Sequence, residues 1–260
     1  MNNIETKRQS YAIAITSMAQ VKDAMVTKAF ASVPRELFLT SIINPELIYE
    51  DILVPLYPEK GINNGQPSLH ALCIDKAAIQ PGEKILHIGC GSGYYSAILA
   101  ELTTSTGSVV AWDIETSLAT AAANNLAQWL NVTVACRSGT EAPIPKSDVI
   151  YISAGCSQPL QIWLDALSDN GGRLIFPLTP GAKAGDMLKI TKYNDTYKAQ
   201  FFCPCRFIPC SGTHNIEMES RLVAAYARGD RDRVCALYLN VAINPKICWV
   251  AGDNWWLGTK

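Results

Sequence analysis

The chain of 260 residues lacks both a long hydrophobic run and an excess of charge of either sign. No apolar stretch approaches the ~20 residues that a membrane-spanning helix needs. The N-terminal sequence MNNIETKRQS lacks the apolar core of a signal peptide. With 22 Lys and Arg against 23 Asp and Glu, the net charge is −1, so a nucleic-acid partner has little electrostatic support. We therefore expect a cytoplasmic globular protein with no membrane partner and no nucleic-acid partner.

Cysteine is plentiful, because the chain has nine, an odd number. Without a signal peptide, free thiols in a reducing compartment are the expected state. Four residues, Cys203, Cys205, Cys210 and His214, have a spacing from which a zinc site can be drawn. Because Cys203 and Cys205 are also same-face residues of an expected strand, we favour the strand and expect no metal. The sequence shows no Ser-His-Asp triad and no paired carboxylates.

From Gly82 onward, short apolar runs alternate with amphipathic stretches. The expected strands are 85–88, 108–112, 132–136, 149–153 and 173–176, and the expected helices are 95–102, 117–129 and 159–167. Such alternation predicts an α/β fold with a doubly wound, mostly parallel, Rossmann-like sheet. Ligands of these sheets bind beyond the carboxyl ends of the strands.

The two ends of the chain have a different character. Apolar spacing predicts helix over the first thirty residues, broken at Val33-Pro34, then a loop-rich segment and a helix over 69–79. After Pro180 we expect strands over 187–193 and 198–208, helix over 217–238 with an interruption at Gly229, and a terminal hairpin turning at Gly252-Asp253. The predicted division is an N-terminal region (1–80), a cofactor-binding core (81–214) and a C-terminal extension (215–260).

The run HIGCGSGYYSAILAEL carries the clearest chemistry. It follows an expected strand and spaces Gly89, Gly91 and Gly93 as G-x-G-x-G, which lets the backbone turn tightly and approach a ligand. A dinucleotide fingerprint requires glycine where Tyr94 stands, whereas this spacing is usual in S-adenosyl-L-methionine (SAM) methyltransferases. Asp113 ends the next strand, where a carboxylate can accept from both ribose hydroxyls, and Glu115 is a rival for that role.

Many blocks in the same order give the chain a family resemblance over about residues 20 to 215. They are VPRELFL (33–39), YED (49–51), Val54-Pro55, Gln66-Pro67, IGCGSGYYSAILAEL, VVAWDIETSLATAAANNL, DVIYISAG, GGRLIFPL and RFIPCSG. In these blocks the sequence resembles the protein-L-isoaspartate (D-aspartate) O-methyltransferases. The resemblance implies transfer of a methyl group from SAM to a carboxylate in a peptide or protein. Such a reaction needs alignment and desolvation more than a general base, because a carboxylate is already ionised at neutral pH.

Three positions depart from the family pattern. The family's threonine–isoleucine–serine loop, whose serine touches substrate and cofactor, is here Asn63-Asn64-Gly65 in a loop about two residues longer. His87 replaces an acidic residue before the glycine motif, and Ser138 replaces the acid of a Gly-Asp-Gly segment. His87 is read as a neutral, hydrogen-bonded strand residue or as a contact or pH-sensitive gate of the cofactor. The replaced serine argues for an altered acceptor, with donors from Asn63, Asn64, Gln66, Ser68, His70 or the backbone.

The resemblance therefore assigns two sets of candidate residues and leaves two rival functions. One rival is a specialised carboxyl methyltransferase of a biosynthetic peptide or small natural product; the other is a non-catalytic SAM-binding interaction module. The expected acceptor is thus a peptide, protein or small-molecule carboxylate. The acceptor-positioning candidates are Asn63, Asn64, Gly65, Gln66 and Ser68, and the cofactor-binding candidates are His87, Gly89, Gly91, Gly93, Asp113, Ser138 and Gly139.

Overall fold

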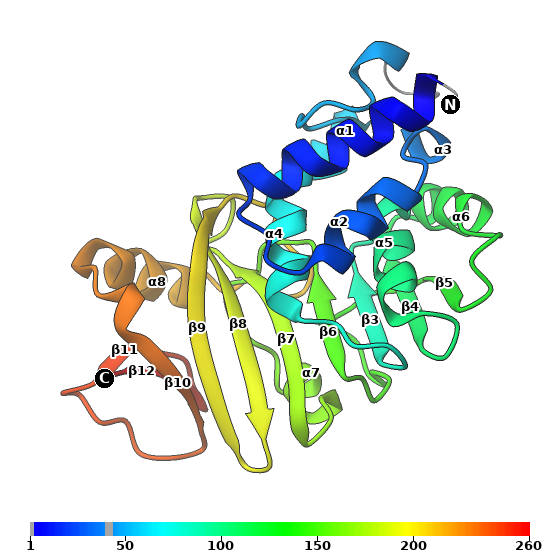
Figure 1. Cartoon of the computed structure of the whole chain (residues 1–260). Helices are drawn as coiled ribbons and strands as arrows, with labels where there is room; N and C mark the ends of the chain where they lie inside the picture. The colour runs from blue at the N-terminus through cyan, green and yellow to red at the C-terminus, as the bar shows by residue number, and fades with distance from the viewer. Residues whose placement is uncertain (1–2, 40–43) are drawn as a thin grey trace. The chain divides into compact units, whose positions relative to one another are not determined.

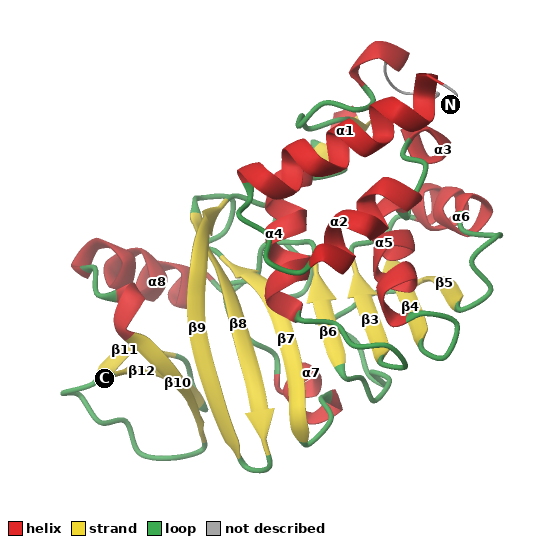
Figure 2. Ribbon diagram, viewed as in Figure 1, coloured by secondary structure: helices red, strands yellow, loops and turns green. Residues whose placement is uncertain are grey.

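The computed structural model describes residues 3–39 and 44–260, and the chain divides into two compact units, Met1–Gly139 and Thr140–Lys260. Figures 1 and 2 show the helices and strands of each unit. We describe each unit by itself. None of the described helices is long and apolar enough to cross a membrane.

The first unit is built on three parallel strands, β3, β4 and β5, in that spatial order. Helices α5 and α6 connect them and pack on them, and α1, α2 and α4 pack against one another and against α5 (Figure 1). A two-stranded antiparallel hairpin, β1–β2, precedes α4. The elements are α1 (Asn3–Met18), α2 (Ala24–Ser32), α3 (Glu36–Leu39), β1 (Pro55–Tyr57), β2 (Ile62–Asn63), α4 (Pro67–Ala77), β3 (Lys84–Ile88), α5 (Tyr94–Thr103), β4 (Ser108–Asp113), α6 (Thr116–Asn125) and β5 (Val132–Cys136), with short 3₁₀ turns at Pro45–Leu47 and Pro58–Lys60.

The second unit contains strands that lie side by side in the spatial order β11-β12-β10-β9-β8-β7-β6. Only β6 and β7 run parallel, and the pairs from β7 onward are antiparallel. Figure 2 shows β7, β8 and β9 as long neighbouring strands. The elements are β6 (Val149–Ile152), α7 (Gln161–Ala166), β7 (Asn170–Leu178), β8 (Gly185–Tyr193), β9 (Thr196–Cys205), α8 (Ile216–Arg228), a 3₁₀ turn (Arg231–Arg233), β10 (Val234–Leu239), β11 (Cys248–Ala251) and β12 (Trp255–Thr259).

Burial and capping explain where the central elements form. Helix α5 is buried along almost its whole length, as its mostly apolar sequence YYSAILAELT favours. Asp23 caps α2 by accepting from the Met25 amide at 2.8 Å, and Asn215 caps α8 by accepting from the Met218 amide at 2.9 Å. The α/β class and the strand–helix alternation from β3 to β7 are confirmed.

Some expected elements differ from the structure. The first-thirty-residue helix breaks between α1 and α2, and Met1 and Asn2 lie outside the described residues. The helix expected to reach Trp129 ends at Asn125, and the one expected over 159–167 is the shorter α7. The loop-rich segment contains the β1–β2 hairpin.

The expectation of helix up to Tyr238 was wrong. Gly229 and Asp230 adopt left-handed φ values of 84° and 59°, which end α8, and Val234–Leu239 forms β10. This strand pairs with β9 and β12, so ladder hydrogen bonds on both sides decide its structure.

Candidate functional site

The glycine loop leaves the end of β3 and enters α5. Gly89, Gly91 and Gly93 have φ values of 77°, 55° and 93°, a region that side-chain-bearing residues rarely adopt. A Cβ at Gly91 would lie 2.9 Å from Leu56 Cδ1, and one at Gly93 would lie 2.8 Å from Leu126 Cδ1. The loop is therefore closely packed and exposes main chain rather than side chains.

Asp113 sits at the end of β4, directly beside the glycine loop. Its Oδ2 accepts from the Gly91 amide at 2.8 Å, and its Oδ1 accepts from the Glu115 amide at 3.0 Å. Asp113 is only 7% exposed to solvent. This burial raises the pKa of its carboxyl group above the usual value. A carboxylate offers about four lone-pair positions, so it has capacity for further donors such as hydroxyl groups.

Glu115 is engaged elsewhere. Its Oε2 lies 2.6 Å from the Lys60 Nζ, which belongs to the β1–β2 hairpin. The ion pair ties the hairpin to the segment that follows β4. Glu115 thereby differs from Asp113, whose carboxylate faces the glycine loop.

The segment after β5 completes this edge of the first unit. The Arg137 amide donates to the Asp113 carbonyl at 2.9 Å, and the Arg137 guanidinium lies 4.5 Å from the centre of the Trp112 ring. A Cβ at Gly139 would lie 2.3 Å from Ile88 Cγ2, so the chain passes closest to β3 where it has no side chain. Gly139, with Ser138 beside it, is thus gathered with the glycine loop and Asp113 around the carboxyl ends of β3, β4 and β5.

His87 is a buried residue of β3. Its Nδ1 lies 2.8 Å from the Ser96 hydroxyl of α5, and the side chain is 1% exposed. Burial lowers the pKa of His87 to about 3, so the ring is neutral at physiological pH. The neutral, hydrogen-bonded interpretation agrees with this geometry, while a contact between His87 and the cofactor stays a prediction.

Two of the candidate acceptor residues hold the start of α4 in place. Asp51 Oδ1 accepts from the Ser68 amide at 2.8 Å, and its Oδ2 accepts from the Ser68 hydroxyl at 2.7 Å and from Gln66 Nε2 at 2.9 Å. Asp51 therefore caps α4 from a distance. The sequence drew attention to it only as part of the YED block.

The other candidate acceptor residues form the loop itself. Asn63 Oδ1 accepts from the Gly65 amide at 2.9 Å, which makes an Asx turn. Asn64 is 8% exposed, and its Oδ1 accepts from the Val54 amide at 2.7 Å. The Nδ2 of Asn64 is buried and has no hydrogen-bond partner among the described residues.

His70 is a neighbour of this loop and lies outside the two sets of candidate residues. Its ring stacks on Tyr95 with centroids 3.8 Å apart and planes inclined by 6°, and the Tyr95 hydroxyl donates to the Gly65 carbonyl at 3.3 Å. A Cβ at Gly65 would lie only 2.0 Å from His70 Nε2. Burial, then the nearby His87 and Arg35, lowers the pKa of His70 to about 3. The sequence offered His70 as one alternative donor but gave no sign of the stacking.

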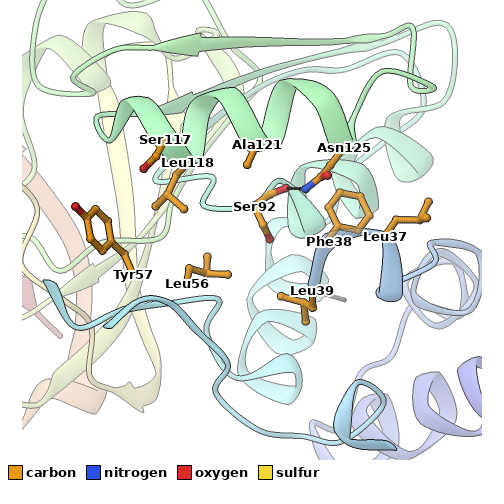
Figure 3. A pocket seen from close by; sticks show the side chains of 10 residues that line it. All are labelled: Leu37, Phe38, Leu39, Leu56, Tyr57, Ser92, Ser117, Leu118, Ala121 and Asn125. Carbon is orange, nitrogen blue, oxygen red and sulfur yellow. Dashed lines mark hydrogen bonds between the residues drawn. The ribbon is translucent and has the colours of Figure 1, made fainter. Parts of the chain in front are cut away.

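A cavity of about 480 Å³ adjoins the glycine loop at Ser92. Figure 3 shows the side chains of Ser117, Leu118 and Ala121, all from α6, facing Leu56 across it. Its lining is mostly apolar: Leu37, Phe38, Leu39, Leu56, Tyr57, Ser92, Ser117, Leu118, Ala121 and Asn125. None of the candidate site residues is among them.

In the second unit, cysteines are occupied by packing and by hydrogen bonds to the main chain. The Cys156 thiol donates to the Ala154 carbonyl at 3.3 Å, the Cys210 thiol donates to the Ser211 carbonyl at 3.7 Å, and Cys205 is buried on β9. His214 pairs with Glu219. Within residues 3–39 and 44–260, no group of three or more His, Cys, Asp or Glu side chains is placed to hold a metal ion.

The family model of protein-L-isoaspartate(D-aspartate) O-methyltransferase matches residues 8–215. The chain belongs to this family. Curated relatives of that name include one from Rhodopseudomonas palustris, 33% identical over 198 residues that cover 74% of this chain and 87% of the relative. Another, from Protochlamydia amoebophila, is 32% identical over 197 residues that cover 74% and 90%.

Solved structures share the fold. A protein-L-isoaspartate O-methyltransferase superposes with a TM-score of 0.71 at 21% identity, covering 97% of this chain and 88% of its own. A candidate enzyme of that name from Plasmodium falciparum, solved with S-adenosyl-L-homocysteine, has a TM-score of 0.68 at 19% identity and covers 78% and 98%. The first superposition extends well past the family match, so its fold includes most of the segment after Asn215.

Proposed function

We propose that this chain transfers a methyl group from SAM to a carboxylate in a peptide or protein, with an acceptor site of its own. The observation that carries the proposal is the arrangement of Asp113 against the left-handed glycine loop. It stands in a chain that belongs to a carboxyl methyltransferase family.

The residues at the carboxyl edge of the first unit fit an adenosine-containing cofactor. Gly91 and Gly93 present main chain without side chains, and Asp113 has acceptor capacity for ribose hydroxyls. Glu115 is held by Lys60, so we assign the ribose to Asp113 rather than to Glu115. Ser138 and Gly139 border the same edge and are assigned to the adenine. When bound, SAM supplies a methyl group on a positively charged sulfur.

The residues of the site do not have to remove a proton from the acceptor. An acceptor carboxylate has an ordinary pKa near ~4 and is ionised without a general base. The buried histidines stay neutral and are not required to remove a proton. What the site must provide is alignment of the acceptor oxygen and exclusion of water. We assign that alignment to the loop Asn63–Ser68, which Tyr95 joins to the start of α5.

The experiment is methyl transfer from methyl-labelled SAM to a panel of acceptors. The panel contains an isoaspartyl peptide, the same peptide with ordinary aspartate, a peptide whose only carboxylate is its C-terminus, and small organic acids. We expect label in a base-labile ester, released as methanol at high pH. Label found only in base-stable products would overturn the carboxylate assignment.

A second candidate is a specialised carboxyl methyltransferase of a biosynthetic peptide or small acid. The glycine at position 65 and the ring of His70 against it favour an acceptor site unlike the family's. The same panel separates the two, because this candidate predicts turnover of C-terminal or small carboxylates and little turnover of the isoaspartyl peptide. A non-catalytic module predicts binding of S-adenosylhomocysteine without any labelled product.

A further inference from the structure

We propose that Asn64 is the specificity-determining residue of the acceptor site, and that its side-chain Nδ2 donates a hydrogen bond to the acceptor carboxylate. This inference rests on the proposed function, because it names the group that recognises the carboxylate in that reaction. It assigns to a buried amide the task that a hydroxyl at position 65 would otherwise perform.

Most hydrogen-bond donors of the loop already have a partner within the protein. Gln66 Nε2 and the Ser68 hydroxyl both donate to Asp51. The Gly65 amide donates to Asn63 Oδ1. Among the side chains of Asn63, Asn64, Gln66 and Ser68, only Asn64 combines burial with a donor that lacks a partner in the described residues.

A buried amide donor without a hydrogen-bond partner, such as Asn64 Nδ2, is unusual. Nearly all buried polar groups in folded proteins have a hydrogen-bond partner, and one that lacks a partner calls for an explanation. Asn64 is also fixed in orientation, because its Oδ1 accepts from the Val54 amide at 2.7 Å. The amide nitrogen is therefore the end that a ligand can satisfy.

The loop Asn63–Ser68 lies beside the position that we assign to the cofactor. Gly65 is joined to α5 through the Tyr95 hydroxyl, two residues after the last glycine of the loop. On the first strand of the hairpin, Leu56 lies against Gly91. Asn64 therefore follows a hairpin whose first strand packs against the glycine loop, and it precedes a residue that is bonded to the start of α5.

Position 65 has no room for a side chain. Its φ of 74° disfavours any residue except glycine, and His70 Nε2 occupies the space that a Cβ would need. His70 is held there by its stack on Tyr95. A side-chain donor for the acceptor must therefore come from a neighbouring position.

Arg35 places a positive charge near the His70 side of the loop, whereas the Asp51 carboxylate binds its other end at Gln66 and Ser68. Arg35 is fully buried, and its guanidinium donates to the Tyr11 hydroxyl and to the Glu50 and Ile52 carbonyls. In the part of the chain that the structure describes, no carboxylate lies within 4 Å of it. Its positive charge contributes to the low pKa of His70, so the field of Arg35 reaches the wall of the proposed acceptor site.

The test compares Asn64→Asp with wild type, using labelled SAM and whichever carboxylate acceptor of the panel wild type esterifies. The variant keeps the oxygen that accepts from Val54, but it replaces the donor by a second oxygen. We expect the acceptor KM to rise about 10- to 100-fold while the dissociation constant for S-adenosylhomocysteine stays unchanged. The matched control is Asn124→Asp, the same change at an exposed position of α6, which should leave both values at wild type.

The possible failures are distinct. A wild type that binds S-adenosylhomocysteine but esterifies no acceptor overturns the proposed function. An active wild type together with an Asn64→Asp variant of unchanged acceptor KM overturns only the assignment of Asn64.

A second measurement uses wild type alone, in case the variant does not fold. With asparagine side chains labelled with nitrogen-15, adding the acceptor peptide to the S-adenosylhomocysteine complex should shift the Asn64 Nδ2 resonances. The Asn124 resonances should stay in place. An Asn64 signal unmoved at saturating acceptor would overturn the proposal.

Discussion

The two sides of the first unit to which we assign the cofactor and the acceptor are built in different ways. Around Gly89–Gly93 and Asp113 the geometry is made by main chain, because glycines turn the backbone and the carboxylate binds amide groups. Around Asn63–His70 it depends on several side chains: Asp51 and Asn64 accept from the Ser68 and Val54 amides, and His70 stacks on Tyr95. Main-chain geometry tolerates few residue types, whereas side-chain contacts can be exchanged in pairs. This difference is consistent with a glycine motif that resembles the family pattern beside a loop that departs from it.

The largest expected effect is on the cofactor side. In Asp113→Ala, the Gly91 and Glu115 amides lose their acceptor and the ribose loses its partner, so affinity for S-adenosylhomocysteine should fall about 100-fold. Calorimetric titration measures this directly, with circular dichroism to show that the variant is folded. An affinity within threefold of wild type would remove Asp113 from the cofactor site.

The stability of the protein at acid pH tests the burial of two histidines, His87 near the glycine loop and His70 near the loop Asn63–Ser68. Each has a pKa near 3 in the folded chain and about 6.5 when unfolded, so the unfolded state binds protons first as the pH falls. Stability is therefore fully present above pH 6.5 and declines below it. Between pH 6.5 and 5.0 each histidine should remove roughly 2 kcal/mol from the free energy of unfolding.

Urea denaturation at pH 7.5 and 5.0 measures this loss. Either His87→Gln or His70→Gln should reduce the loss by about 2 kcal/mol, since glutamine does not titrate. Equal losses in wild type and both variants would show that neither histidine is buried in its neutral form.

A smaller effect is expected at the contact of Gly65 with His70. Gly65→Ala introduces a Cβ into the space of the imidazole at a left-handed φ, so it should cost about 1–2 kcal/mol of unfolding free energy. His70→Ala opens that space, and the double variant should therefore lose less than the sum of the single variants. Strict additivity in this cycle would show that the two positions do not share the space.

The smallest effect is expected at the ion pair of Lys60 with Glu115. Both side chains are partly exposed, and exposed pairs are weak and screened by salt. Lys60→Ala or Glu115→Gln should change affinity for S-adenosylhomocysteine by no more than about threefold at low salt, and not at all near 0.5 M salt. A loss as large as that of Asp113→Ala would reverse the assignment of the ribose.

The sequence predicted the local structure around Gly89–Gly93 better than that around Asn63–His70. The glycine spacing, the preceding strand and Asp113 are local in sequence, and all stand where they were expected. His70 stacks on Tyr95, 25 positions away, and Asp51 caps α4 at Ser68, 17 positions away. The periodicity of a sequence does not predict contacts of this kind. Strand β10 was missed for a similar reason, since its structure depends on β9 and β12 rather than on its own pattern.

The separation of the two sides can be measured by hydrogen–deuterium exchange of wild type, first with S-adenosylhomocysteine and then with an acceptor peptide added. We expect the cofactor to protect residues 88–95 and 112–116, and the acceptor then to add protection over 62–70. An absence of protection over 88–95 with the cofactor, or an acceptor that leaves 62–70 unchanged while protecting another segment, would contradict this expectation.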